Sequence, residues 1–384
     1  MDASVNRIKS STDERAFLLG IRILKINYDL DELHDSLNEL KLLVRTAGAV
    51  VIDTAIVKRE KIDPAYIIGK GYLLKLQDLI RNNKITLVVF DINQLKPAQV
   101  RNLEEVLKCR VVSRTEIIFD IFAKRARSAE AHIQVELAQL RYILPRLKGL
   151  GGALSQTGGG IGTRGPGEKM LETDRRHIVK RISKLETRLK KISNHRSLIR
   201  KSRSDIVRGA VVGYTNAGKS TLINKLAKDD LFVEDRLFAT LDSFTRIVYL
   251  EPEKKVLLTD TVGFIRNLPV SLIESFKSTL EEIKNADFLI HVVELTSKDI
   301  EKKIEIVDKE LAELQCNNKP TILFFNKSDA VKEANVVLTK YHNALIGSAE
   351  KNIGISELKQ KISEIFNYYH NSKNTEYKQV RTGE

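Results

Sequence analysis

The chain has 384 residues, 42% of them hydrophobic and 30% charged, a balance typical of globular proteins that excludes a largely disordered chain. Its length allows two or three domains. No apolar stretch approaches the length of a membrane span, and the first residues, Met1-Asp2-Ala3-Ser4, predict no secretion signal. The net charge of +14 indicates a polyanionic partner, most simply RNA, unless it reflects only a lysine-rich composition.

The chain has two cysteines, Cys109 and Cys316, which lie far apart in different predicted segments. Such sparse usage predicts a reducing compartment and neither a disulfide framework nor a zinc site. We expect both side chains to be small residues of the core rather than reactive thiols.

Residues 1–125 alternate apolar runs with stretches of helical spacing. Strands are predicted at 16–24, 49–52, 87–90 and 111–112, and helices at 30–43, after Gly71 and at 97–107. This order of elements predicts a small α/β domain with a largely parallel sheet. The region carries no phosphate loop and no catalytic cluster.

Residues 126–205 predict two helices that pack against each other. The first has one apolar face, formed by Ile133, Leu137, Leu140 and Leu144. Pro145 is expected to end it. The second begins at about Glu168 and has a similar seam, formed by Ile178, Ile182, Leu185, Leu189 and Ile192. Two facing seams predict an antiparallel helical hairpin or a short coiled coil.

The second of these helices is strongly basic, with few acidic residues to offset its charge. Its basic residues are Arg175, Arg176, Lys180, Arg181, Lys184, Arg188, Lys190, Lys191, Arg196, Arg200, Lys201 and Arg203. A run of one sign predicts either an RNA-facing surface or a solvated helix face, and the sequence leaves both interpretations open.

Glycines gather between the two helices. They lie in Gly149-Leu150-Gly151-Gly152 and in Gly158-Gly159-Gly160-Ile161-Gly162-Thr163-Arg164-Gly165-Pro166-Gly167-Glu168. A flexible linker is one interpretation. Because Thr163, Arg164 and Pro166 are unusual in a linker, we favour a loop at the tip of the hairpin that approaches a nucleic-acid backbone.

Residues 206–370 begin with an apolar strand, 210–212, that runs into the pattern G-x-x-x-x-G-K-[ST] and then a helix. The nine residues of this phosphate loop are Gly213, Tyr214, Thr215, Asn216, Ala217, Gly218, Lys219, Ser220 and Thr221. Backbone N–H groups of such a loop surround a phosphate, and the helix N-terminus adds partial positive charge. We expect Lys219 to neutralise the outer phosphates and Ser220 to ligate magnesium. The strands and helices that follow predict a doubly wound nucleotide-binding domain.

A second motif, D-x-x-G, follows the apolar run 256–259. Its residues are Asp260, Thr261, Val262 and Gly263. We expect the carboxylate of Asp260 to hold the magnesium ion through water. The backbone N–H of Gly263 is expected to contact the γ-phosphate.

A third motif, N-K-x-D, selects the base and consists of Asn326, Lys327, Ser328 and Asp329. The carboxylate of Asp329 can accept from the ring N–H and the amine of guanine, a donor pair that adenine lacks. Lys327 is expected to lie along the base. Backbone N–H groups of Ser348, Ala349 and Glu350 are expected to close over the guanine oxygen. Four such elements in this order predict a GTPase that requires magnesium.

Phe264 stands where many signalling GTPases carry a glutamine that orients the attacking water. Because phenylalanine cannot hydrogen-bond water, another group must do so, and slow intrinsic hydrolysis is expected. Asn216 can compensate by holding a monovalent cation, such as potassium, against the phosphates. Simple packing within the loop is the alternative, and equal hydrolysis rates in potassium and in sodium would favour it.

Four strings of sequence resemble the HflX family of ribosome-associated GTPases, in the Obg–HflX group. They are 160–168, Gln134-Val135-Glu136-Leu137-Ala138-Gln139-Leu140, Leu237-Phe238-Ala239-Thr240-Leu241-Asp242 and Asp260-Thr261-Val262-Gly263-Phe264-Ile265. The resemblance covers nearly the whole chain. Ser243-Phe244 and Lys169-Met170 depart from the Pro-Thr and Thr-Gln that are usual in the family. A polar tail, 371–384, is expected to fray.

The resemblance implies a cytoplasmic, monomeric GTPase that binds the large ribosomal subunit and its RNA and splits or rescues stalled ribosomes. An RNA-binding assembly factor of that subunit, in which hydrolysis times release, is the alternative. The loop 238–246 and the loop from Asp260 are expected to be the two switches. In the first of them, Phe238, Ala239, Thr240, Leu241 and Asp242 are expected to bind the nucleotide. Thr240 would complete the magnesium shell and act in catalysis with Lys219 and Gly263.

Overall fold

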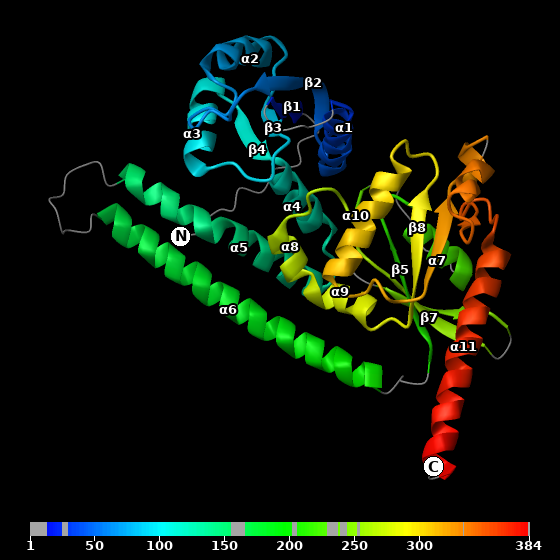
Figure 1. The fold of residues 1–384 in the computed structure, drawn as a ribbon. Coiled ribbons are helices and arrows are strands. Elements are labelled where there is room, and N and C mark those ends of the chain that lie inside the picture. Colours follow the sequence, from blue (N-terminus) through cyan, green and yellow to red (C-terminus); the bar gives the residue numbers. More distant parts are fainter. Residues whose placement is uncertain are drawn as a thin grey trace. The chain divides into compact units, whose positions relative to one another are not determined.

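The computed structural model describes most of the chain. The described residues are 14–24, 30–154, 166–201, 206–228, 237–238, 244–251, 254–332 and 334–382. They divide into two compact units (Figure 1). Unit 1 comprises Met1–Leu189 and Asn267–Ser275, and unit 2 comprises Lys190–Arg266 and Phe276–Glu384. Within the described ranges, no helix is long and apolar enough to cross a membrane.

Unit 1 begins with a four-stranded sheet in the order β2-β1-β3-β4, in which every neighbouring pair is parallel. Its strands are β1 Arg15–Ile23, β2 Val50–Arg59, β3 Leu87–Phe90 and β4 Arg110–Ser113. Its helices are α1 Leu30–Ala47, α2 Lys70–Asn82, α3 Pro97–Leu107 and α4 Arg114–Arg125. α1 packs against α4, and α2 packs against α3. The prediction of an α/β domain with a parallel sheet is therefore confirmed.

Both faces of this sheet are covered, which explains the continuous apolar runs in its strands. Ala16, Leu18 and Leu19 of β1 have no exposed surface. Phe17 and Phe90 pack in the cluster that includes Leu73 and Leu76 of α2 and Leu103 of α3.

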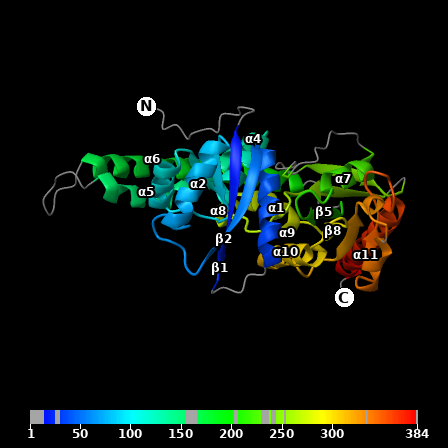
Figure 2. The same ribbon diagram turned by 90° about the horizontal axis from the view of Figure 1, so that it is seen from above.

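Helices α5 (Ala129–Leu154) and α6 (Pro166–Lys201) run side by side in opposite directions (Figures 1 and 2). This is the predicted antiparallel hairpin. Ion pairs between described residues join the helices: Arg181 Nε lies 2.6 Å from Glu136 Oε1, and Arg141 Nη2 lies 2.8 Å from Glu186 Oε1. The short helix α8 (Val270–Ser275) also belongs to unit 1 and packs against α5.

The prediction that Pro145 ends the first helix of the hairpin is wrong, because Pro145 lies inside α5. A proline in a helix removes one backbone hydrogen bond and is normally disruptive. The Pro145 side chain is exposed, so its ring lies on the solvent side of the helix, while the neighbouring side chains pack against one another and against α4. The Arg146 guanidinium stacks 3.3 Å from the centroid of the Tyr142 ring, which itself meets the Phe119 ring of α4 at 5.1 Å.

Unit 2 is built on a six-stranded sheet in the order β10-β9-β8-β5-β7-β6, parallel except for β6. Its strands are β5 Arg208–Gly213, β6 Thr245–Tyr249, β7 Lys255–Asp260, β8 Phe288–Glu294, β9 Thr321–Asn326 and β10 Leu345–Ile346. Its helices are α7 Lys219–Ala227, α9 Lys277–Lys284, α10 Ile300–Glu313 and α11 Ile355–Thr382, with short 3-10 turns η1 Ser328–Ala330 and η2 Ala334–Thr339. The predicted doubly wound GTPase fold is confirmed.

The core of unit 2 joins strands β5 and β8 to helices α7 and α11. Val211, Ile290, Leu222 and Leu358 have no exposed surface and belong to one cluster. α11 continues through residues 371–382, where the sequence predicts a frayed tail. The stretch contains no glycine or proline, so nothing in the backbone stops the helix at residue 370.

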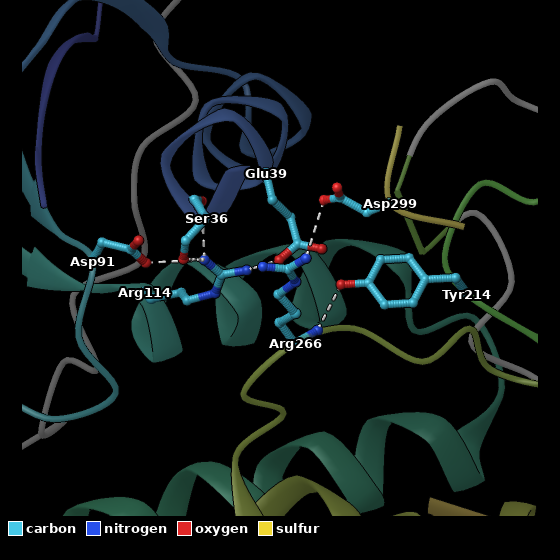
Figure 3. Close-up of polar contacts among 7 residues, drawn as sticks. All are labelled: Ser36, Glu39, Asp91, Arg114, Tyr214, Arg266 and Asp299. Carbon is cyan, nitrogen blue, oxygen red and sulfur yellow. Dashed lines mark hydrogen bonds and ion pairs between the residues drawn. The ribbon is translucent and has the colours of Figure 1, made fainter. Parts of the chain in front are cut away.

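A buried arginine organises the carboxyl edge of the sheet in unit 1. Arg114, the first residue of α4, is fully buried and donates to Asp91 Oδ1 at 2.9 Å and to the hydroxyl of Ser36 at 3.2 Å. Its other terminal nitrogen pairs with Glu39 of α1. Figure 3 shows these partners around the guanidinium. The group links the end of β3, the start of α4 and the covering helix α1.

Replacing Arg114 by methionine is expected to lower the free energy of unfolding by about 3–5 kcal/mol, because two largely buried carboxylates lose their cation. Arg110→Met is the matched control. Its ion pair with Glu14 is 3.9 Å long and its side chain is 35% exposed, so a change of about 0–1 kcal/mol is expected. Urea denaturation of the two full-length variants measures the difference. Equal losses of unfolding free energy in the two variants would mean that the buried ion cluster stabilises the fold no more than the exposed ion pair does.

Candidate nucleotide-binding site

The four sequence motifs meet at one edge of the sheet in unit 2. The phosphate loop follows β5, the D-x-x-G motif follows β7, the N-K-x-D motif follows β9, and Ser348–Glu350 follows β10. In a parallel sheet, these carboxyl ends lie together. The chain leaves β5 for β7 on one side and later pairs β8 on the other, which makes this a topological switch point, where ligands of such sheets bind.

The phosphate loop wraps into the start of α7 through two residues with left-handed backbone. Asn216 has φ of 63° and Gly218 has φ of 90°. At Gly218 a Cβ atom would come within 2.2 Å of Asn326 Nδ2, so only glycine fits beside that side chain. The conformation aims the N-terminus of α7 at the edge of the sheet, as phosphate binding requires.

The side-chain amide of Asn326 joins three of the motifs. Its Nδ2 donates to the carbonyl of Ala217 in the phosphate loop at 2.9 Å, and its Oδ1 accepts from the backbone N–H of Ala349 at 2.9 Å. Asn326 is 2% exposed. The first residue of N-K-x-D thus fixes the phosphate loop relative to the loop that is predicted to close over guanine.

The two predicted magnesium ligands that the structure describes lie side by side. Ser220 Oγ donates to Asp260 Oδ2 at 2.6 Å, and Asp260 is buried. A hydroxyl and a carboxylate are the hard oxygen ligands that magnesium prefers, together with phosphate oxygens and water. The donor set therefore fits magnesium, with the serine at the start of α7 and the aspartate at the end of β7.

Lys219 lies deep in the loop, where its Nζ donates to the carbonyl of Tyr214 at 2.9 Å and to that of Gly213 at 3.2 Å. Burial lowers the pKa of Lys219 to about 8, and the charge of Asp260 opposes the shift. Gly263 stands against this ammonium group, since a Cβ atom there would lie 2.8 Å from Lys219 Nζ. Behind the loop, burial and then the charge of Lys219 lower the pKa of His291 to about 4, so this imidazole is neutral at pH 7.

Two contacts prepare the loop that is predicted to recognise the base. Asp329 is exposed, and a hydrogen bond with Ser348 lowers its pKa below the ordinary value, which keeps the carboxylate ionised. Lys327 has a left-handed backbone with φ of 66°, and its Nζ lies 2.8 Å from Glu294 Oε1. Glu294, at the end of β8, is a residue that the sequence motifs do not identify.

The remaining predicted residues divide into described and undescribed ones. Thr221 lies in the first turn of α7, Thr261 donates its hydroxyl to the carbonyl of Val211 at 2.7 Å, and Val262 is buried. Phe238 is described and 2% exposed. Of the predicted first switch, Ala239, Thr240, Leu241, Asp242 and Ser243 lie outside the described residues, as do Arg164 and most of the glycine-rich loop.

Unit 2 is therefore a phosphate-loop GTPase domain, because this edge combines a phosphate loop with a loop whose carboxylate can accept the two donors of guanine. Comparisons with known proteins agree. A family described as 50S ribosome-binding GTPase matches residues 208–327. Families described as GTP-binding GTPase N-terminal and GTP-binding GTPase Middle Region match residues 34–123 and 125–203.

The chain belongs to the GTPase HflX family, whose members hydrolyse GTP, and it is itself a GTPase. It is 49% identical to the GTPase HflX of Caldanaerobacter subterraneus over 91% of this chain and 80% of that protein. Identity to the GTPase HflX of Alkalihalophilus pseudofirmus is 45%, over 93% and 84%. Identity to that of Escherichia coli is 38%, over 89% and 82%.

Asp329→Asn is expected to weaken GTP binding on the order of a thousandfold, because an amide presents a donor where guanine also presents one. Xanthosine triphosphate carries an oxygen at that position and should bind the variant better than GTP does. Fluorescence titration of the parent and the variant with both nucleotides measures the change in preference from GTP to xanthosine triphosphate. Retention of the parent's GTP affinity in the variant would exclude Asp329 from base recognition.

The pKa of Lys219 predicts that nucleotide binding takes up protons in mild alkali. Near pH 8 the buried amino group of Lys219 should be about half deprotonated, and bound phosphates favour its charged form. Binding of GDP should therefore be accompanied by the uptake of roughly half a proton per site by Lys219. Uptake should vanish at pH 6.5, where Lys219 is already charged. Calorimetry of GDP binding in two buffers that differ in ionisation enthalpy gives the number of protons taken up. Equal uptake at the two pH values would contradict this assignment.

Proposed function

We propose that this protein uses its GTPase cycle on the large ribosomal subunit and splits or rescues stalled ribosomes. The observation that carries the proposal is the exposed basic stripe on α6, in a chain of the HflX family with a match to a family described as 50S ribosome-binding GTPase. Ribosomal RNA is the polyanion that such a stripe would meet in that setting.

The basic stripe consists of Lys180, Lys184, Arg188 and Lys191, spaced by four, four and three residues along α6. That spacing puts the four side chains on one face of the helix. All four are exposed, and none has a hydrogen bond or an ion pair with another described residue. Uncompensated charge of one sign in a row is suited to a phosphate backbone, whose counterions it releases.

One predicted RNA contact must be set aside. Arg181 is engaged within the hairpin, because its Nε and Nη2 lie 2.6 and 2.9 Å from the two carboxylate oxygens of Glu136. This two-point pair with an acid raises the pKa of Arg181. Arg181 therefore supports the hairpin, and we confine the proposed RNA surface to the stripe.

Within the site we propose that Lys219 binds the outer phosphates, that Ser220 and Asp260 hold magnesium, and that Thr240 completes the ion's shell. The bound ion supplies charge for the developing negative charge on the phosphates. The backbone N–H of Gly263 is proposed to contact the γ-phosphate, and Asn326 to keep the base and phosphate loops in register. A potassium ion at Asn216 remains an alternative to loop packing.

Ribosome splitting and subunit assembly make different predictions for intact ribosomes. Full-length protein with a non-hydrolysable GTP analogue is mixed with intact ribosomes and sedimented. Conversion to free subunits supports splitting. If the protein instead sediments only with free large subunits and leaves intact ribosomes unchanged, the assembly role replaces the proposal.

The stripe should carry much of the salt-dependent ribosome affinity. Replacing Lys180, Lys184, Arg188 and Lys191 by glutamine removes four charges, so affinity should fall on the order of tenfold or more and depend less steeply on salt. A matched control replaces four exposed lysines of unit 2, Lys255, Lys309, Lys332 and Lys361. It removes the same charge elsewhere and should bind nearly as the parent does.

Both variants must keep the parent's melting curve and GTP affinity before they are compared by co-sedimentation at several salt concentrations. Equal weakening by both variants would mean that net charge alone drives binding. Unchanged binding by the stripe variant would move the ribosome contact to another surface.

A further inference from the structure

The phosphate loop is tied to the segment after D-x-x-G by a ladder of hydrogen bonds. The backbone N–H of Thr215 donates to the carbonyl of Phe264 at 2.8 Å, and the N–H of Phe264 donates to the carbonyl of Gly213 at 3.1 Å. Tyr214 and Phe264 form a parallel bridge. The pairing of β5 with β7 is thus renewed beyond the ends of the two strands.

A side chain extends this ladder by one further bond. The hydroxyl of Tyr214 accepts from the backbone N–H of Arg266 at 2.8 Å (Figure 3). Tyr214 is 6% exposed, and Lys303 Nζ lies 5.2 Å from the centroid of its ring. The hydroxyl is therefore directed at the segment after D-x-x-G.

Arg266 is held at its side chain as well. Its Nη2 lies 3.2 Å from Asp299 Oδ2, at the start of α10, and both side chains are largely shielded from water. The two contacts bind Arg266 from opposite ends, one at the backbone and one at the guanidinium. Arg266 is also the last residue of unit 2 before the chain enters Asn267–Ser275 of unit 1.

Gly263 lies within the part of the chain that these contacts fix. The ladder clamps Phe264, the next residue, and the hydroxyl of Tyr214 clamps Arg266, three residues on. Gly263 itself packs against Thr215, because a Cβ atom there would lie 2.8 Å from Thr215 Cα. A group that must meet a reacting phosphate gains from being placed before the reaction.

We propose that Tyr214 is a positioning residue for GTP hydrolysis. Its hydroxyl holds the backbone of Arg266, and so sets the place of Gly263 and Phe264 over the phosphate loop without touching the nucleotide. This role concerns hydrolysis by the protein alone and is independent of any action on ribosomes.

Tyr214→Phe removes only the hydroxyl and leaves the ring in place. The turnover number for GTP hydrolysis should fall about fivefold, the factor that corresponds to one ordinary hydrogen bond. KM for GTP and Kd for GDP should stay within twofold of the parent's values, because in this proposal the hydroxyl acts on Arg266 and not on the nucleotide. Hydrogen exchange at the Arg266 amide should quicken, since that N–H loses its acceptor.

Tyr369→Phe is the matched control, because it also deletes a tyrosine hydroxyl bonded to the backbone of unit 2, at 2.8 Å to the carbonyl of Asp287. Tyr369→Phe should shift the melting temperature about as much as Tyr214→Phe does. It should leave the turnover number and the hydrogen exchange of the Arg266 amide unchanged. Asp299→Asn loosens Arg266 from its other end and should lower turnover in the same sense as Tyr214→Phe.

Two results would overturn the proposal. One is a Tyr214→Phe protein with the parent's turnover number. The other is a loss of turnover matched by an equal loss of GDP affinity or by an equal loss in Tyr369→Phe, which would make the hydroxyl a purely structural group.

Discussion

The amide of Asn326 is the contact on which the nucleotide site depends most. One planar group donates to the phosphate loop and accepts from the loop after β10, so three segments far apart in the sequence share one reference point. An amide suits this place because it offers a donor and an acceptor on the same rigid plane, whereas a carboxylate or an amine offers only one of them. Because the side chain is buried, water cannot replace either bond if it is lost.

Two residues of the phosphate loop, Gly218 and Lys219, are also arranged for phosphate binding. Gly218 lacks a side chain where the amide of Asn326 passes, and Lys219 has its ammonium group turned onto backbone carbonyls of its own loop. Burial in the loop disfavours the charge of Lys219 and lowers its pKa, although the charge of Asp260 opposes the shift. A phosphate that enters the loop supplies the missing negative charge, so the site gains electrostatic energy at the atom where binding is needed.

Much of the fold and most of the site follow from the sequence, because their causes are local. The phosphate loop, D-x-x-G and N-K-x-D each need particular residues at fixed spacing, and apolar runs reveal the strands that precede them. Other features depend on contacts that spacing does not encode. Arg114 meets Glu39 and Asp91 across long stretches of chain, and α5 runs through Pro145, where the residue type alone predicts an end. The sequence shows Tyr214 within the phosphate loop, but the partner of its hydroxyl, the N–H of Arg266, is visible only in the structure.

The chain passes between the two units three times, after Leu189, after Arg266 and after Ser275. No single cut can therefore release either unit whole. A fragment that begins at β5 would keep α8 but lose α5, against which α8 packs, so the apolar side chains of α8 that contact α5 would be open to water. Exposing one leucine costs about 1.5–3 kcal/mol of hydrophobic stabilisation, a large share of a domain's margin. Unit 2 is compact but is made of two separate stretches of sequence. The stability measured on a truncated GTPase fragment would therefore not be that of the unit in the intact chain.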